Sequence, residues 1–157
     1  MTDKLDFKTE YKKIQKKYNL PEFDLLNKEF ELGELEKKDF LLRVLRRKMR
    51  DKLIFFCRII EGILYPTDRS PLLTYESGFF DENLKENLMT LHKTMMLFDR
   101  QSLLLEVEAT EAKDIEFILK LWKEWPQFKR ELIKVIVVME HSWLSTTQEQ
   151  KTEGYFG

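Results

Sequence analysis

Apolar residues recur every three or four positions along most of the chain, which is the spacing of one face of an α-helix. The longest such run predicts a helix over residues 34–65, which Pro66 ends because the residue before proline disfavours helical backbone angles. Its buried stripe would consist of Leu42, Leu45, Met49, Leu53, Phe56, Ile60 and Ile63. A further run in steps of four and three, over residues 84–105, predicts another long helix with Asp81 as its N-cap.

Shorter stretches of the same pattern fill the remaining chain. Residues 4–18 predict a short helix, and Pro21 suits the first turn of a second one. Residues 110–122 predict another helix. Pro126 marks either a kink in that helix or the start of the last one, which extends over residues 126–144.

Together these elements predict an all-α fold, a single-domain helical bundle of about five or six helices, three of them long, over residues 1–144. The chain has 5 Gly and 4 Pro, fewer than a β domain with many tight turns requires. Residues 66–80 would form a long connection, and residues 145–157 a flexible polar tail. The β-branched run at residues 135–138 leaves a strand as the alternative at that point.

The predicted last helix is apolar nearly all round. Its main stripe would consist of Phe128, Leu132, Val135, Ile136, Met139 and Trp143. A helix of this kind is buried on more than one side, so it lies at the centre of the bundle or a partner covers its outer face. The partner in the second case would be a protein, including a second copy of the chain, and the candidate self-association face is formed by Ile133, Val137 and Leu144.

The charge balance and the single cysteine narrow the classes of function. Lys and Arg number 27 against 28 Asp and Glu, whereas a dedicated polyanion binder is usually strongly basic. Cys57 alone allows neither an intramolecular disulfide nor a cysteine zinc site. Residues 1–13 lack the apolar segment of a secretory signal, and no apolar run approaches the roughly 18–20 residues that span a bilayer. We therefore expect a cytoplasmic protein that does not bind membranes.

Four arginines lie on one face of the predicted 34–65 helix: Arg43, Arg46, Arg47 and Arg50. Because guanidinium groups bind phosphates with paired hydrogen bonds, this face is the candidate surface for an anionic partner such as RNA or DNA. The acidic windows 22–36 and 106–116 support the other interpretation, in which ion pairs between helices engage the arginines. No aromatic stacking motif, glycine-rich phosphate loop or Cys/His finger accompanies them.

The sequence lacks the motifs of catalysis and metal binding. Neither His92 nor His141 belongs to the Glu-x-x-His pair that a carboxylate-bridged metal centre in a bundle needs. No nucleophile elbow, P-loop or dinucleotide fingerprint occurs, so we predict neither an enzyme nor a bound cofactor or metal. The predicted 66–80 connection carries a candidate loop site, Asp68, Arg69, Tyr75 and Glu76. A candidate motif at the end of the tail, Tyr155 and Phe156, is a recognition segment, docks on its own bundle or belongs to a disordered end.

Two segments of the N-terminal third carry a resemblance to known proteins. The segment Lys17-Tyr18-Asn19-Leu20-Pro21-Glu22-Phe23, continued through Leu45-Arg46-Arg47-Lys48-Met49, resembles small helical proteins of unknown function from archaeal genomes. The resemblance implies no activity and no site residues. We predict a non-enzymatic protein–protein interaction or adaptor module, with a homodimer as one form of it and nucleic-acid binding as the alternative.

Overall fold

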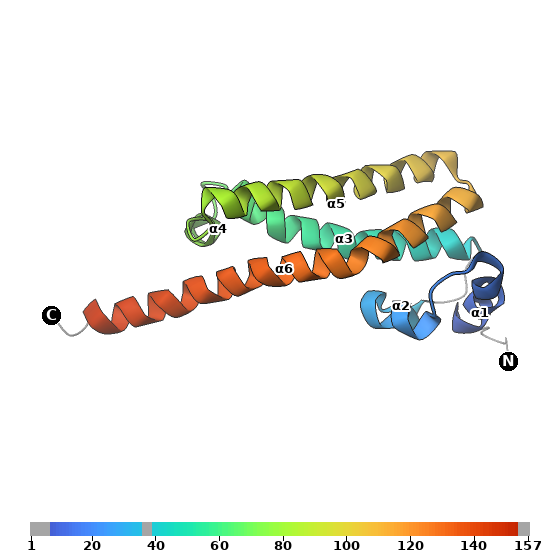
Figure 1. The fold of residues 1–157 in the computed structure, drawn as a ribbon, viewed down its shortest axis with the longest axis horizontal. Helices are drawn as coiled ribbons and strands as arrows, with labels where there is room; N and C mark the ends of the chain where they lie inside the picture. Colours follow the sequence, from blue (N-terminus) through green and yellow to red (C-terminus); the bar gives the residue numbers. More distant parts are fainter. Residues whose placement is uncertain (1–6, 36–38, 154–157) are drawn as a thin grey trace. The chain divides into compact units, whose positions relative to one another are not determined.

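Helices make up the fold in the computed structural model, which describes residues 7–35 and 39–153, with side chains described as far as Leu144 (Figure 1). In chain order the elements are α1 (Phe7–Tyr18), α2 (Phe23–Phe30), the 3₁₀ turn η1 (Leu32–Glu34), α3 (Leu41–Leu64), α4 (Pro71–Ser77), α5 (Glu82–Glu108) and α6 (Glu111–Glu153). The described ranges contain no strand, so the predicted all-α class with several long helices is confirmed. The strand alternative at residues 135–138 is wrong.

The chain divides into two compact units. Unit 1 comprises Met1–Phe55 and Met95–Trp125, and unit 2 comprises Phe56–Thr94 and Pro126–Gly157. The long helices α3, α5 and α6 each contribute one part to unit 1 and the other part to unit 2. The sequence does not show this division, because hydrophobic spacing identifies the buried face of a helix and not the elements that cover it.

Helix α3 begins later than the sequence predicted, at Leu41 rather than near residue 34. Phe40 has a φ of 64° and Glu31 a φ of 57°, which are left-handed conformations that a right-handed helix cannot contain. The N–H of Glu31 binds the carbonyl of Asn27 at 2.8 Å and so ends α2. Helix α2 therefore ends at Phe30, and α3 begins after Phe40.

Helix α6 joins two of the predicted helices and extends beyond them. It continues through Pro126 to Glu153, so the interpretation of Pro126 as a new helix start is wrong. Residues 145–153, which the sequence assigned to a polar tail, are helical. The candidate tail motif, Tyr155 and Phe156, lies outside the described residues.

Aromatic side chains attach α2 to α6 within unit 1. The ring centroids of Phe30 and Trp125 lie 4.6 Å apart, and the indole N–H of Trp125 donates to the carboxylate of Glu29 at 2.9 Å. The hydroxyl of Tyr11 in α1 donates to the carbonyl of Pro21 at 2.5 Å, which holds the connection between α1 and α2. These buried rings and their satisfied polar atoms form one end of the unit 1 core.

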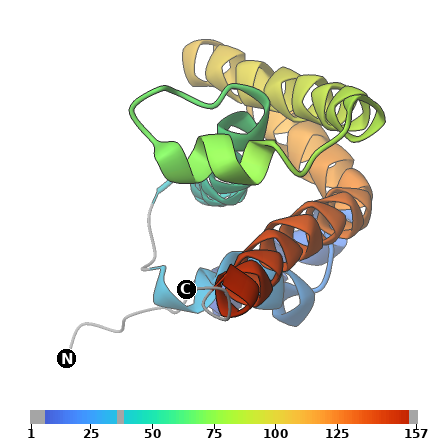
Figure 2. The same cartoon turned by 90° about the vertical axis from the view of Figure 1, so that its left-hand side faces the viewer.

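Helix α4 in unit 2 lies inside the segment that the sequence read as a connection (Figure 2). The hydroxyl of Ser70 accepts a hydrogen bond from the N–H of Leu73 at 3.4 Å, and Pro71 occupies the first turn. Both are ordinary signals of a helix start, because Ser caps free N–H groups and Pro has none to satisfy. Helix α4 was not predicted because it has only 7 residues, which are too few to show a clear apolar period.

Small residues allow α4 to lie close to α3. A Cβ atom added to Gly62 would come within 3.0 Å of the Leu73 side chain, so glycine provides the space for this contact. The hydroxyl of Ser77 donates to the carbonyl of Ile63 at 2.7 Å. Helix α4 therefore packs on α3 through a close approach and a buried hydrogen bond.

Candidate functional site

Arg46 forms the centre of a buried polar network in unit 1. Its side chain is fully buried, and its Nε donates to Asp114 Oδ1 at 2.6 Å. Its Nη1 donates to the hydroxyl of Ser102 at 2.7 Å and to the backbone carbonyl of that residue at 3.0 Å, while Nη2 donates to Glu106 Oε1 at 3.0 Å. A buried charge is tolerated where it is paired and hydrogen-bonded, and this network meets both conditions.

Arg47 and Arg50 bind further carboxylates of α5. Arg47 donates from Nε and Nη2 to the two oxygens of Glu106, at 2.8 Å and 2.6 Å. Arg50 Nε donates to Asp99 Oδ1 at 2.7 Å. The arginines therefore do not form one open cationic face, because these two and Arg46 lie on the side of α3 that meets acidic side chains of α5 and α6. The structure matches the ion-pair interpretation of the sequence pattern.

Glu106 accepts hydrogen bonds from two arginines at once. The bonds from Arg47 first, and those from Arg46 next, lower the pKa of the Glu106 carboxyl from 4.5 to about 2, against the opposing effect of burial. The carboxylate therefore stays ionised throughout the physiological pH range. Its charge compensates the guanidinium groups that would otherwise attract an anion.

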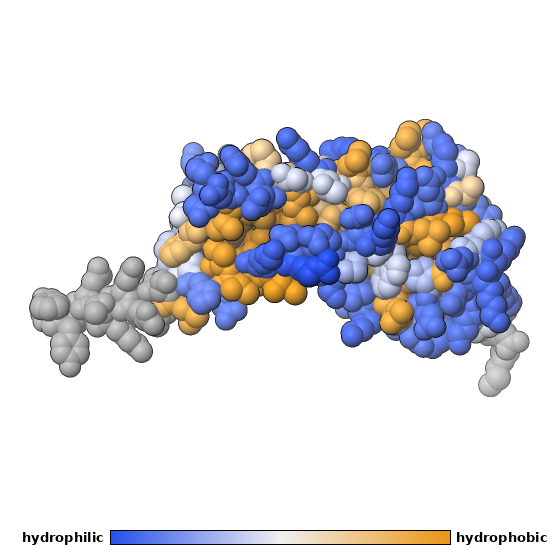
Figure 3. Space-filling view, in the orientation of Figure 1, coloured by the Kyte–Doolittle hydropathy of each residue, from blue (hydrophilic) through white to orange (hydrophobic). Residues whose placement is uncertain are grey.

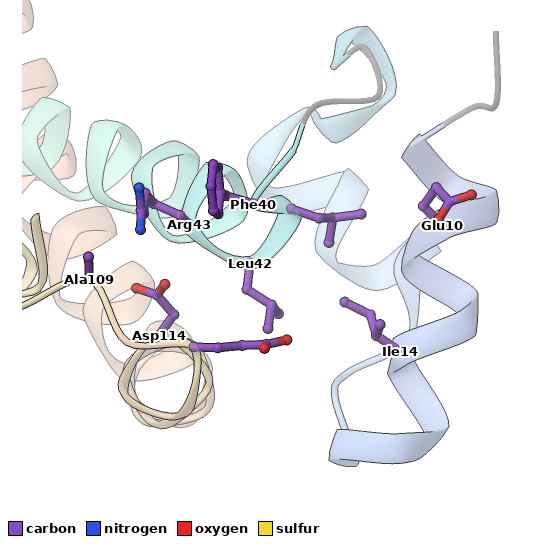
Figure 4. Close-up of a pocket in the computed structure, with 9 residues that line it drawn as sticks. Glu10, Ile14, Phe40, Leu42, Arg43, Ala109 and Asp114 are labelled. Carbon is purple, nitrogen blue, oxygen red and sulfur yellow. The ribbon is translucent and has the colours of Figure 1, made fainter.

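Arg43 differs from the other three arginines because it makes no such ion pair within the described residues. Its guanidinium carbon lies 4.7 Å from the ring centroid of Phe40, and its Nε is buried without a hydrogen-bond partner there. It borders a pocket of about 420 Å³, into which α1 contributes Glu10 and Ile14 (Figure 4). The pocket also contains the carboxylates of Glu111 and Asp114. Glu10 is paired with Lys13 and Asp114 with Arg46, so Glu111 is the carboxylate of this pocket that most directly opposes the binding of a phosphate group.

The candidate loop site separates into two pairs of residues. Tyr75 and Glu76 belong to α4 and fix it to α6: the Tyr75 hydroxyl donates to the carbonyl of Ser142 at 2.7 Å, and the indole N–H of Trp143 donates to Glu76 at 3.3 Å. Asp68 and Arg69 precede α4 and are exposed to solvent. Tyr75 and Glu76 therefore have packing roles.

Nothing in the described ranges suggests a metal centre. They contain no group of three or more His, Cys, Asp or Glu residues that could hold a metal ion. His92 binds Glu61 through its Nε2 at 3.0 Å and lies beside the ring of Tyr65 in unit 2. His92 is therefore a hydrogen-bonded packing residue, whereas His141 is exposed.

The second part of α6 has an apolar outer face in unit 2. Ile133 is 58% exposed, Val137 43% and Leu144 54%. Glu140, also exposed, lies between them at helical spacing, and we call these four residues the outer stripe. The opposite side of the same helix is buried, with Phe128, Leu132, Val135 and Ser142. Figure 3 shows apolar side chains gathered over this part of α6 and interrupted by hydrophilic ones.

Ile136 and Trp143 border the outer stripe on one side, and we call them the apolar edge. The sequence placed both in the buried stripe, but they are 43% and 42% exposed, so that assignment is wrong. They lie at the margin of the helical wheel, where spacing alone does not distinguish a buried position from an open one. Trp143 packs on Tyr75, with ring centroids 5.1 Å apart, and Phe79 lies at the same distance from Tyr75.

Comparisons with known proteins add no relative: no protein-family model, curated protein or solved structure matches this chain. None of the helices in the described part of the chain is long and apolar enough to cross a membrane.

Proposed function

We propose that this chain is a cytoplasmic, non-enzymatic protein–protein interaction module whose docking surface is the outer stripe of α6 together with its apolar edge. The observation that supports it is the exposure of Ile133, Val137 and Leu144 on the side of α6 opposite its buried face. Single exposed apolar residues are common on monomers, whereas several on one helix face are typical of a binding surface.

Trp143 gives this surface an aromatic anchor. Its indole N–H is bound by Glu76 and its ring by Tyr75, so the side chain is held in place before a partner arrives. Trp and Tyr are enriched among the residues that dominate binding energies, and a fixed side chain loses little conformational entropy on binding.

Nucleic-acid binding through the arginines receives less support. The guanidinium groups of Arg46, Arg47 and Arg50 already bind carboxylates, and Arg46 is inaccessible to solvent. A phosphate would have to displace these ion pairs and then meet the remaining negative charges.

The test is affinity capture from cells of the native organism with the tagged wild-type chain and the double variant Ile133→Glu/Val137→Glu. We expect the wild type to retain a protein that the double variant loses. This protein is either a different chain or an untagged copy of the same chain. Val107→Glu is the control, because it adds a carboxylate at an 83% exposed apolar position of α5 outside the outer stripe. If the double variant retains the same proteins as the wild type, with matching circular dichroism spectra, the proposal is wrong.

A further inference from the structure

We propose that the partner of the outer stripe is a second copy of this chain, bound with the two α6 helices antiparallel. This inference rests on the proposed function of the stripe and adds the identity and orientation of its partner. The antiparallel orientation follows from the side chains that border the outer stripe on its two sides.

The outer stripe has the spacing of a helix–helix seam. Ile133, Val137, Glu140 and Leu144 follow one another in steps of four, three and four residues, as alternating a and d positions of a heptad do. Such a seam fits another helix with the same spacing, and a second copy of α6 provides one. The seam is bordered by the apolar edge, Ile136 and Trp143, and on its other side by a polar edge, Lys134 and His141.

A parallel pair of α6 helices would be unfavourable at two points. It would place Glu140 directly opposite the Glu140 of the second copy, so that two carboxylates with like charge would meet in the seam. It would also place the apolar edge of each helix against the polar edge of the other, since parallel helices bring these flanking positions together.

An antiparallel pair removes both conflicts. With the twofold axis between Val137 and Glu140, Ile133 faces Leu144 of the second copy and Val137 faces Glu140 of the second copy. The apolar edges then meet each other, and Phe79 beside Tyr75 extends that contact. Lys134 of the second copy lies at the border of the seam, where the Glu140 carboxylate would share it with Glu131, its ion-pair partner at 2.9 Å in its own chain. The same patch is used by both copies, so the assembly closes as a dimer.

The dimer should be weak. Side chains from one helix and one neighbouring ring bury less surface than a standard interface of about 1,600 Å². We expect a dissociation constant on the order of 10 µM, which sedimentation equilibrium measures directly. Glu140→Leu should tighten the dimer roughly tenfold, because a buried carboxylate is replaced by an apolar side chain of similar size.

Disulfide formation between single variants tests the orientation. In a Cys57→Ala background, the variants Ile133→Cys and Leu144→Cys are oxidised separately and as a mixture of the two. In the antiparallel dimer the mixture forms a 133–144 disulfide, while Ile133→Cys alone does not crosslink, because its two copies lie about 16 Å apart along the axis. A parallel dimer gives the reverse result.

The outcomes distinguish this inference from the proposed function. A dimer that Glu140→Leu tightens, with the mixed disulfide, supports the inference. A dimer with the 133–133 disulfide overturns the antiparallel orientation. A chain that stays monomeric at about 1 mM, with or without Glu140→Leu, overturns the second copy as partner. If the chain is monomeric but the wild type captures a different protein that Ile133→Glu/Val137→Glu loses, the proposed function still holds. If the chain is monomeric and captures no such protein, the proposed function is wrong too.

Discussion

Unit 1 and unit 2 contain two unusual patterns on their helices, and the fold uses them in opposite ways. Three arginines of α3 in unit 1, Arg46, Arg47 and Arg50, bind Asp99, Glu106 and Asp114 of α5 and α6, so these three charges are compensated inside the unit. The apolar residues of the outer stripe in unit 2 meet solvent, and the described residues provide nothing that covers them. A charge that is already paired has little left to offer a partner, whereas an open apolar face gains free energy when a partner covers it.

The largest expected effect comes from breaking the buried network. Arg46→Met removes the partner of Asp114, whose side chain is 5% exposed, and leaves a buried carboxylate without its charge pair. We expect a loss of about 3–5 kcal/mol in the free energy of unfolding, measured by urea denaturation.

Arg47→Met is the matched control for that measurement. Its side chain is 51% exposed, so its ion pair with Glu106 is screened by water and should contribute about 1 kcal/mol or less. If the two variants lose equal stability, burial does not govern the strength of the network. The contrast between the paired arginines of unit 1 and the exposed outer stripe of unit 2 would then not hold.

Lowering the pH should weaken the same network through Glu106. Its pKa in the folded protein, about 2, lies below the ordinary value of 4.5, so the stabilisation is complete above pH 4.5 and is lost as the pH falls towards 2. Because this carboxylate is partly exposed, screening limits the effect to about 1 kcal/mol. Urea denaturation at several pH values should show the wild-type advantage over Glu106→Gln shrinking between pH 5 and pH 2.5, and a constant difference would contradict the assignment.

Substitution on the outer stripe should leave the stability of the monomer almost unchanged. Ile133→Glu replaces a side chain that already contacts water, so we expect a change within about 0.5 kcal/mol at protein concentrations where the chain is monomeric. Thermal or urea unfolding at low concentration measures this. A loss above about 2 kcal/mol would show that Ile133 is packed inside the protein and does not belong to a docking surface.

The smallest expected effect is on nucleic acid. Because Arg46, Arg47 and Arg50 are paired with carboxylates, we expect no mobility shift of a single-stranded RNA or a duplex DNA oligonucleotide, even at low salt. A shift that weakens with added salt and disappears in Arg47→Glu would instead support nucleic-acid binding by the arginines of α3.

The sequence predicted the elements whose signals are local. Hydrophobic spacing located the buried stripe of α3 except at Phe56, which is only partly buried while the next residue, Cys57, lies in the core. The N-cap at Asp81 is confirmed by its 2.8 Å hydrogen bond from the N–H of Leu84. Hydrophobic spacing also marked Ile133, Val137 and Leu144 as apolar residues outside the main stripe of their helix. A periodic pattern identifies such positions because each helix carries it independently of its neighbours.

The sequence could not predict what depends on the arrangement of helices. The pairing of Arg46 with Asp114 joins residues far apart in the chain, and only the packing of α3 on α6 determines it. Left-handed Phe40 was likewise missed. The continuity of α6 through Pro126 was one of two alternatives that the sequence left open, because local preference alone does not decide between a continued helix and a new start at proline. The exposure of the outer stripe of α6 was predicted only as one of two alternatives, because hydrophobic spacing does not show whether another element covers a helix face.

Sedimentation equilibrium of the wild-type chain beside Ile133→Glu/Val137→Glu measures whether the outer stripe joins two copies of the chain. We expect a monomer–dimer equilibrium for the wild type, with a dissociation constant on the order of 10 µM. We expect a monomer for the double variant at every concentration and an unchanged equilibrium for Val107→Glu. A wild type that remains monomeric, or a double variant that dimerises as strongly as the wild type, would contradict this expectation.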